Sequence, residues 1–426
     1  MENKLSKKFY FAMILFSFIG QVAWVVENMY FNVYIYKIFN ATPSDISLMV
    51  AMSAVAACVT TLLIGALSDK LGRRKAFMCY GYILWGISIM SFNLIPTLAG
   101  NSLRLGVSLV IIMDCVMTFF GSSANDACFN AWLTDSTDST NRGKVEGLNS
   151  MMPLLAVLAV FGGFMGFDLQ LIDSWNIIYI VIGTLAIICG IIGFFVIKDS
   201  TVTDDGDTNY FKNIFYGFRP STIKNNKKLY ILLGFFAIFN IAVQIFMPYL
   251  ILFYEKTLNM DNYVIIMAPA IIIAAILTAL YGKMYDKHGF SKTVWIPLYM
   301  MIIGACLLVL FNQTVIVFIA STFLLSGDLM GMGIFGAGIR DNTPIDKVGR
   351  FQGIRIFGQV LIPGVIGPSI GAAVLKNAPK VINSDGTKAF IPNTMIFVCT
   401  VVVLIILVSM LYITLKLSDK KEKEKL

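Results

Sequence analysis

The chain has 426 residues, of which 57% are hydrophobic and 14% charged, and its mean hydropathy is +0.77. Soluble domains have a near-even apolar share and about a quarter of charged residues, so this composition excludes a water-soluble protein. The formal net charge of +8 resides in short basic runs between apolar segments, a pattern of membrane proteins rather than nucleic-acid-binding proteins. We therefore expect an integral membrane protein in a lipid bilayer, with no nucleic-acid partner.

Segments of about 20 apolar residues are long enough to cross the hydrocarbon core of a bilayer as helices. The sequence contains twelve, which predicts an all-α membrane protein. Their predicted extents are 9–36, 45–68, 76–96, 105–133, 146–168, 175–197, 229–253, 262–284, 293–311, 314–339, 352–375 and 392–415. The fourth segment also carries carboxylate and amide side chains, which must face protein or a cavity because lipid cannot solvate them.

The distribution of basic residues predicts the orientation of these spans. With the N-terminus inside, 26 of the 33 Lys and Arg residues fall in cytoplasmic segments and six in outer loops. The first apolar stretch is too long for a signal peptide and has no small-residue cleavage site, so we expect it to remain as a helix. The prediction is a multi-pass protein of the plasma or inner membrane with both termini cytoplasmic.

The longest predicted cytoplasmic connection divides the chain into two sets of six spans. The expected parts are an N-terminal half at 1–197, a linker at 198–228, a C-terminal half at 229–415 and a basic tail at 416–426. Within the linker, apolar residues recur at i, i+3, i+4 and i+7, namely Phe211, Ile214, Phe215 and Phe218. This spacing predicts a helix lying on the inner leaflet, with an irregular loop as the alternative.

Two sequence patterns of the first half recur in the second. The segment 135–147 matches 341–353 at its Asp, Thr, Gly, basic and final Gly positions, and the loop at 65–75 matches the loop at 282–292. Parallel repeats of six helices are the plan of a large class of secondary transporters. We therefore expect two pseudo-repeated six-helix halves.

The loop from Gly65 to Lys75 reads Gly-Ala-Leu-Ser-Asp-Lys-Leu-Gly-Arg-Arg-Lys. It resembles the signature of the major facilitator superfamily, a Gly, three residues, Asp, a basic residue, one residue, and Gly-Arg-Arg/Lys. The loop at 282–292 resembles a weakened second copy, with Phe290 and Ser291 at the arginine positions. The resemblance implies this twelve-helix fold and a contact that holds the two halves together when the inner gate is closed; it does not identify a substrate.

The resemblance implies gating roles for these motif residues, and elementary chemistry indicates which contacts each of them can make. Asp69 is placed to accept hydrogen bonds from a neighbouring helix N-terminus, while Gly65 and Gly72 permit close helix approach and a tight turn. Arg73 can pair with Asp135 or Glu146, whereas Arg74 and Lys75 are explained by topology alone. The candidate gating residues are Gly65, Asp69, Gly72, Arg73, Asp135, Arg142 and Asp286.

Polar residues in the middle of spans predict a solute pathway contributed by both halves, because such groups are costly in lipid. Trp24 is placed to stack on a sugar ring, although it can also belong to the interfacial belt. For Asn125, Asn130 and Asn240 the alternative is helix-to-helix hydrogen bonding. The candidate solute-binding residues are Gln21, Trp24, Glu27, Asn28, Asn32, Asn125, Asn130, Asn240, Gln244 and Gln359.

A buried carboxylate is the simplest device for coupling transport to an ion gradient, because binding a proton or a sodium ion neutralises it. The candidates are Glu27, Asp126 and Asp328, with Arg355 as a partner. We expect Asp328 to be the coupling acid, because its own helix offers only an apolar, glycine-rich surrounding. The alternative is a structural ion pair of Arg355 with Asp126 or Asp328.

These features predict a secondary active transporter of a small polar solute that works by alternating access, as a monomer, with H⁺ or Na⁺ as coupling ion and no other cofactor. The segment 125–147 resembles cation-coupled glycoside symporters, which implies sugar symport. Proton-driven efflux of drugs or metabolites and a non-transporting sensor are the alternatives. The chain has no ATP-binding motif, and its only His, His288, lies in a loop, so neither an enzyme nor a metal site is expected.

Overall fold

The structure, a computed structural model, describes residues 5–137, 141–198, 216–260, 262–344, 348–382 and 386–423. Within these residues, twelve helices are long and apolar enough to cross a membrane, which confirms the predicted all-α membrane fold. Several spans extend beyond their predicted ends; the fourth runs over Leu103–Ser136. Its start is fixed by Ser102, whose side chain accepts a hydrogen bond from the backbone N–H of Leu105.

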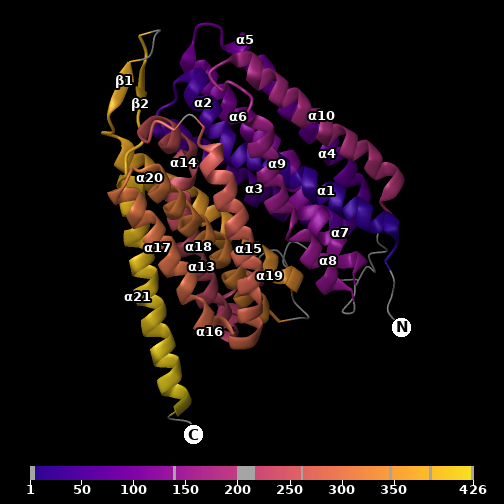
Figure 1. The fold of residues 1–426 in the computed structure, drawn as a ribbon. Coiled ribbons are helices and arrows are strands. Elements are labelled where there is room, and N and C mark those ends of the chain that lie inside the picture. The colour runs from indigo at the N-terminus through magenta and orange to yellow at the C-terminus, as the bar shows by residue number, and fades with distance from the viewer. Residues whose placement is uncertain are drawn as a thin grey trace. The chain divides into compact units, whose positions relative to one another are not determined.

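The chain forms two compact units, whose membrane spans are coloured indigo to magenta in the first and orange to yellow in the second (Figure 1). The first comprises Met1–Ile214 with Ile382–Ala389, and the second comprises Phe215–Val381 with Phe390–Leu426.

The first unit contains the first six spans, three of them built from several consecutive helical segments. Its helical elements are α1 (Lys7–Val25), η1 (Val26–Tyr30), α2 (Phe31–Phe39), α3 (Pro43–Leu71), α4 (Arg74–Ser91), η2 (Phe92–Leu94), α5 (Ile95–Ala99), α6 (Leu103–Gly121), η3 (Ser122–Phe129), α7 (Asn130–Ser136), α8 (Arg142–Asn149), α9 (Met152–Phe164) and α10 (Ile172–Val196).

The second unit contains the remaining six spans, and a short two-stranded sheet in the connection between the last two spans has residues in both units. Its elements are η4 (Tyr216–Phe218), α12 (Pro220–Asn225), α13 (Lys227–Phe246), η5 (Met247–Tyr249), α14 (Leu250–Leu252), η6 (Phe253–Thr257), α15 (Val264–His288), α16 (Phe290–Thr293), α17 (Trp295–Leu310), α18 (Thr314–Asp341), α19 (Val348–Ile356), η8 (Phe357–Leu361), α20 (Ile362–Leu375), β1 (Lys380–Ile382), β2 (Lys388–Phe390) and α21 (Met395–Lys423).

Among the residues that the structure describes, four spans contain a π turn, in which the backbone hydrogen bonds skip one extra residue. These turns are η1 in the first span, η3 in the fourth, η6 in the seventh and η8 in the eleventh. Wide turns of this kind are rare and frequently accompany functional sites. Three of them contain residues that the sequence nominates: Glu27 in η1, Asp126 in η3 and Gln359 in η8.

Glycines bring α4 and α10 into backbone contact in the first unit. A Cβ at Gly86 would lie 2.4 Å from the carbonyl oxygen of Gly183, and one at Gly183 would lie 2.6 Å from the carbonyl oxygen of Gly86. Small residues at such crossings let membrane helices pack closely without a hydrophobic driving force. This crossing therefore depends on two glycines that the sequence patterns did not single out.

Buried aromatic side chains fill the interior of each unit. In the first unit, Tyr34 packs against Trp175 and Tyr179 with ring centroids 5.1 and 5.3 Å apart. In the second unit, Phe335 lies 5.5 Å from Phe236 and 5.4 Å from Phe290. Tyr34, which is buried, therefore belongs to an aromatic cluster that packs helices together inside the first unit.

Both copies of the loop motif have a glycine with a positive φ directly after a helix. Helix α3 is followed by Gly72 with φ +62°, and α15 is followed by Gly289 with φ +70°. Both angles lie in the left-handed region, where a side chain is strained and glycine is not. The repeat seen in the sequence thus has a structural counterpart at the end of one helix in each unit.

The predicted interfacial helix of the linker is outside the part of the chain that the structure describes, because Phe211, Ile214 and Phe215 are not among the described residues. Phe218 is described and ends the short 3₁₀ turn η4.

The basic-residue asymmetry makes a topological prediction. On a cysteine-free background, Asp205→Cys and Ser418→Cys should react with a membrane-impermeant thiol reagent only after the membrane is opened, and Ser384→Cys should react in intact cells. Labelling of residue 205 from outside would contradict the N-in, C-in orientation. Replacement of the seven native cysteines is practical, since all seven are free thiols.

Candidate functional site

A carboxylate from the first span is held by hydroxyls from the second and fourth spans. Glu27 of η1 is buried, and its Oε1 accepts hydrogen bonds from Ser53 Oγ of α3 at 2.7 Å and from Thr118 Oγ1 of α6 at 2.9 Å. The two hydroxyl oxygens are themselves 2.7 Å apart. We call Glu27 Oε1, Ser53 Oγ and Thr118 Oγ1 the oxygen triangle.

A second carboxylate lies beside the oxygen triangle. Asp114 of α6 is 2% exposed, interacts electrostatically with Glu27 and lies close to Ser53. Glu27 Oε2 and Asp114 Oδ1 are buried and have no hydrogen-bond partner among the described residues. The sequence shows Asp114 as a polar residue of span four, but nothing in the spacing indicates that it faces span one.

Asn125 is part of a chain of hydrogen bonds that fixes helix packing. Trp24 Nε1 donates to Asn125 Oδ1 at 3.4 Å, Asn125 Nδ2 donates to the hydroxyl of Tyr82 at 2.7 Å, and that hydroxyl donates to the carbonyl oxygen of Phe16 at 2.5 Å. Both polar atoms of the Asn125 amide are therefore engaged within the protein. This arrangement favours the helix-to-helix alternative for Asn125.

Other polar residues of the first and fourth spans are open to their surroundings. Asn28 and Asn130 are exposed, while Gln21, Trp24 and Asp126 are half-buried. Asn28 Nδ2 donates to the carbonyl oxygen of Trp24 at 2.8 Å, and Ser122 Oγ donates to Asp126 Oδ2 at 2.9 Å. Since lipid does not solvate such groups, this side of the first unit must face protein or a cavity rather than lipid.

Asn32 is the fully buried member of the polar row in the first span. Its Nδ2 donates to the carbonyl oxygen of Asn28 at 2.8 Å, and its Oδ1 has no partner among the described residues. The row is therefore continuous along the helix, with one end buried in protein.

In the second unit the nominated residues lie on α13, α18, α19 and η8. Asn240 is buried and donates to the carbonyl oxygen of Phe236 at 3.0 Å, and Gln244 packs against Gly367. Arg355 Nε donates to Gln359 Oε1 at 3.1 Å, a contact between two residues that lie one helical turn apart. Asp328 is 9% exposed, and no hydrogen bond or ion pair reaches it within the described parts of the chain.

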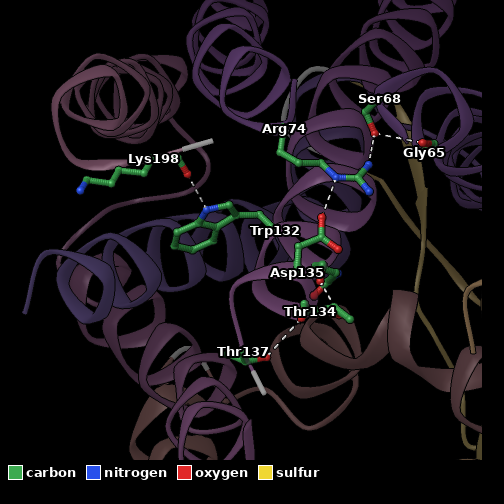
Figure 2. A network of polar contacts seen from close by, with 9 residues as sticks. Gly65, Ser68, Arg74, Trp132, Thr134, Asp135, Thr137 and Lys198 are labelled. Atoms are coloured by element: carbon green, nitrogen blue, oxygen red, sulfur yellow. Dashed lines mark hydrogen bonds and ion pairs between the residues drawn. The ribbon is translucent and has the colours of Figure 1, made fainter. Parts of the chain in front are cut away.

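A polar network closes one end of the first unit at the signature loop. Figure 2 shows Arg74 between two acceptors: its Nε lies 3.2 Å from Asp135 Oδ2, and its Nη1 donates to Ser68 Oγ at 2.5 Å. Ser68 in turn donates to the carbonyl oxygen of Gly65 at 3.0 Å. The Arg74 side chain is only 5% exposed, so the network is built into the protein rather than displayed on it.

The arginine that pairs with Asp135 is therefore Arg74 and not Arg73. Gly72 turns the backbone, Arg73 is the exposed residue before α4, and Arg74 is its first helical residue, from which the side chain reaches back toward α3 and α7. The sequence pattern alone does not show where the helix begins. The side chains of Asp69 and Arg142 lie outside what the structure describes, so their proposed roles remain predictions.

The second unit replaces this ion pair with a neutral donor. At the position equivalent to Asp135, Asp341 Oδ2 accepts a hydrogen bond of 2.6 Å from the hydroxyl of Tyr285. Phe290, which stands in an arginine position of the repeat, packs against Phe335, and Asp286 is exposed. The weakened second copy of the motif thus corresponds to a different contact.

We predict that Arg74→Gln destabilises the protein and that Arg73→Gln, the matched exposed control, does not. Removing one partner of a largely buried, hydrogen-bonded charge pair costs about 1–3 kcal/mol. The measurement is the apparent melting temperature of each purified variant in detergent. Equal melting temperatures for Arg74→Gln and the wild type would show that this network does not stabilise the protein.

The sequence model of the Major Facilitator Superfamily matches residues 10–368 of this chain. A protein of Methanocaldococcus jannaschii described as an uncharacterized MFS-type transporter is 23% identical over 252 residues, 58% of this chain and 61% of that protein. The chain thus matches about three fifths of the length of this curated relative.

Solved transporter structures share the fold at low sequence identity. The nucleoside transporter NupG aligns with a TM-score of 0.70 and 11% identity, over 95% of this chain and 98% of that one. The inward-open xylose transporter XylE from E. coli aligns with a TM-score of 0.68 and 14% identity, over 93% of this chain and 95% of that one. A bacterial homologue of the human lysosomal transporter Spinster aligns with a TM-score of 0.69 and 13% identity, over 96% of this chain and 97% of that one. The chain belongs to the Major Facilitator Superfamily.

Proposed function

We propose that this protein is a secondary active transporter that carries a small polar solute by alternating access, driven by a proton or sodium gradient, with a sugar as the solute. The observation that carries this proposal is the exposure of Asn28, beside half-buried Gln21 and Trp24, in the middle of the first membrane span. Amides and an indole at that depth offer hydrogen bonds and a stacking surface to a solute that has displaced water.

The chemistry of this surface suits a neutral, hydroxyl-bearing solute. Asn28 and Gln21 present amide groups, and no lysine or arginine forms a described ion pair with Glu27 or Asp126 nearby. A sugar matches amide donors and acceptors together with one aromatic face. The fold shared with a xylose transporter and a nucleoside transporter agrees with this class, since both of those solutes contain a sugar ring.

The test is uptake into proteoliposomes that contain the purified protein. Labelled xylose, a labelled disaccharide and labelled uridine are offered separately, with an imposed pH gradient, an imposed sodium gradient and no gradient. Accumulation of a sugar above its outside concentration supports the proposal. Accumulation of uridine alone would identify a nucleoside as the solute. Proton-driven expulsion of an amphipathic dye would favour efflux, and binding of a solute without transport would favour a sensor.

We predict that Trp24→Ala weakens solute binding by about tenfold, which corresponds to the roughly 1.4 kcal/mol of a stacked ring. Trp24→Phe should retain most of the affinity because a ring face remains. The apparent KM of uptake measures both. Trp295→Ala, which removes a tryptophan at the start of α17, serves as the aromatic control. An unchanged KM in Trp24→Ala would show that the Trp24 ring does not contact the solute.

We further propose that the transporter acts as a monomer in the plasma or inner membrane with both termini in the cytoplasm. The twelve spans and the superfamily membership support a multi-pass membrane protein, and the basic-residue asymmetry supports the orientation.

A further inference from the structure

We propose that four cationic side chains at the beginning of the seventh span form a docking surface for an anionic phospholipid. The four are Arg219, Lys224, Lys227 and Lys228, and we call them the basic surface. All four are exposed, and Lys227 is the first residue of the seventh span, which places them where the hydrocarbon of the bilayer meets its headgroups. Binding of a lipid requires neither a solute nor a gradient, so this proposal goes beyond transport.

The charge of this segment has one sign. The ten residues from Arg219 to Lys228 include the four cations, and no Asp or Glu occurs between Tyr216 and Tyr254. Four or more Lys and Arg residues beside a membrane helix attract anionic phospholipids, because each of them interacts favourably with the negative headgroup layer. A zwitterionic headgroup has no net charge and offers much less attraction. The basic surface therefore fits a lipid whose phosphate headgroup carries a net negative charge.

Aromatic contacts hold the segment before the span in place. The Tyr216 ring lies 5.7 Å from the ring of Phe351 in α19, and the Phe218 ring lies 5.5 Å from the ring of Phe357 in η8. The Tyr230 hydroxyl of α13 donates a hydrogen bond to a backbone carbonyl oxygen of η4. Because this backbone is already ordered by the protein, binding a ligand to it costs little further conformational entropy.

Two further contacts orient Arg219 and join α12 to α13. The guanidinium carbon of Arg219 lies 5.6 Å from the centroid of the Tyr216 ring, a cation–π contact. Asn226, the residue between the two helices, donates from Nδ2 to the carbonyl oxygen of buried Thr222 at 2.9 Å. The cations before and after Asn226 are therefore carried by a backbone that these contacts hold together.

The lysines of α13 lie on a face of the helix that continues as an apolar, exposed surface. Lys227 and Lys228 precede Ile231 by four and three residues, so all three share one face. Ile231 is 44% exposed within the span, as suits a side chain in contact with lipid. In α12, exposed Ile223 stands beside Lys224 in the same way. An apolar side chain next to a cation matches the boundary between acyl chains and headgroups.

A second set of three lysines offers a matched comparison. Lys283 and Lys287 of α15 and Lys292 of α16 are exposed and lie at the junction of the eighth and ninth spans. Asp286, also exposed, lies three residues after Lys283 and directly before Lys287, so this set includes a negative charge. The triple variant Lys283→Gln/Lys287→Gln/Lys292→Gln removes three positive charges from a less positive surface, and we call it the matched control variant.

The test is native mass spectrometry of the purified full-length protein in detergent, titrated with phosphatidylglycerol or with phosphatidylcholine that has the same acyl chains. We expect phosphatidylglycerol to bind more tightly than phosphatidylcholine. The triple variant Lys224→Gln/Lys227→Gln/Lys228→Gln should weaken the binding of phosphatidylglycerol about 100-fold, since each lysine near an anionic surface contributes about fivefold. The matched control variant should bind it like the wild type, and replacing the same three lysines of the basic surface with arginine should preserve binding.

Equal losses in the two glutamine triples would overturn the proposal, because net charge alone would then explain them, and so would equal binding of the two lipids by the wild type. Phosphatidylglycerol binding that appears only in Asp204→Asn/Asp205→Asn/Asp207→Asn would show that the acidic stretch of the preceding linker occupies the basic surface. Displacement of the lipid by an equal concentration of inorganic phosphate would assign the surface to a free anion. Size-exclusion profiles show whether each variant is folded, and none of these measurements depends on transport.

Discussion

Replacing Glu27 with glutamine is expected to abolish accumulation of solute against its gradient while solute-for-solute exchange continues. Glutamine is neutral at every pH and keeps a donor toward Ser53 and Thr118, so it holds the site in its loaded form. A transporter that cannot release its proton cannot return empty, but it can still exchange solute. The measurements are uptake driven by a pH gradient and counterflow in proteoliposomes loaded with unlabelled solute.

Asp328→Asn is the informative comparison for this result. Asp328 is the acid that its apolar helix singles out from sequence, and in the structure it is buried without a described partner. If Asp328→Asn loses accumulation and keeps counterflow while Glu27→Gln accumulates solute normally, coupling belongs to the second unit. If both lose accumulation and keep counterflow, coupling requires a carboxylate in each unit.

Gly86→Ala is expected to prevent α4 and α10 from packing and to lower the yield of folded protein severely. The added Cβ would lie 2.4 Å from the carbonyl oxygen of Gly183 and 2.7 Å from Ile187 Cγ1. Backbone cannot move aside as a flexible side chain can, and overpacking of this kind costs about 1–3 kcal/mol or more. Size-exclusion profile and apparent melting temperature in detergent measure the effect.

Gly234→Ala on α13 is the matched control, because a Cβ there would meet nothing within 4 Å. Alanine has the higher helix propensity, by about 1 kcal/mol, so the control should be at least as stable as the wild type. Similar profiles for the two variants would mean that the α4–α10 crossing relaxes by sliding, and that the glycine contact is not essential.

The sequence predicts the twelve spans because lipid imposes a simple rule, that about 20 consecutive apolar residues form a helix. It also locates the paired signature loops. Each loop contains a glycine, Gly72 or Gly289, at the position where the chain turns with a positive φ, which other residues rarely adopt. These features depend on local sequence and on the solvent, so a single chain without relatives is sufficient to predict them.

The site is harder to predict because it depends on which helix faces meet. Spacing places Asp114 on a polar row of span four, but only the packing of α3 against α6 brings Ser53 and Asp114 to Glu27. In the same way, Asn125 carries an amide of the kind that binds polar solutes. Only its hydrogen bonds with Trp24 and Tyr82 show that both polar atoms of this amide already have partners within the protein. Arg74 rather than Arg73 pairs with Asp135 because α4 begins at Arg74, and the sequence does not show at which of the two arginines the helix begins.

The π turn at Val26–Tyr30 makes the length of the first span as important as its composition. One residue corresponds to about 100° of rotation in an α-helix, so a single deletion that converts the turn to α-helical form would rotate everything after it by that angle. Asn32 and Tyr34 would leave their partners, while the residues before the turn kept theirs. Substitution scans keep the length of the span constant, so they cannot detect this kind of information.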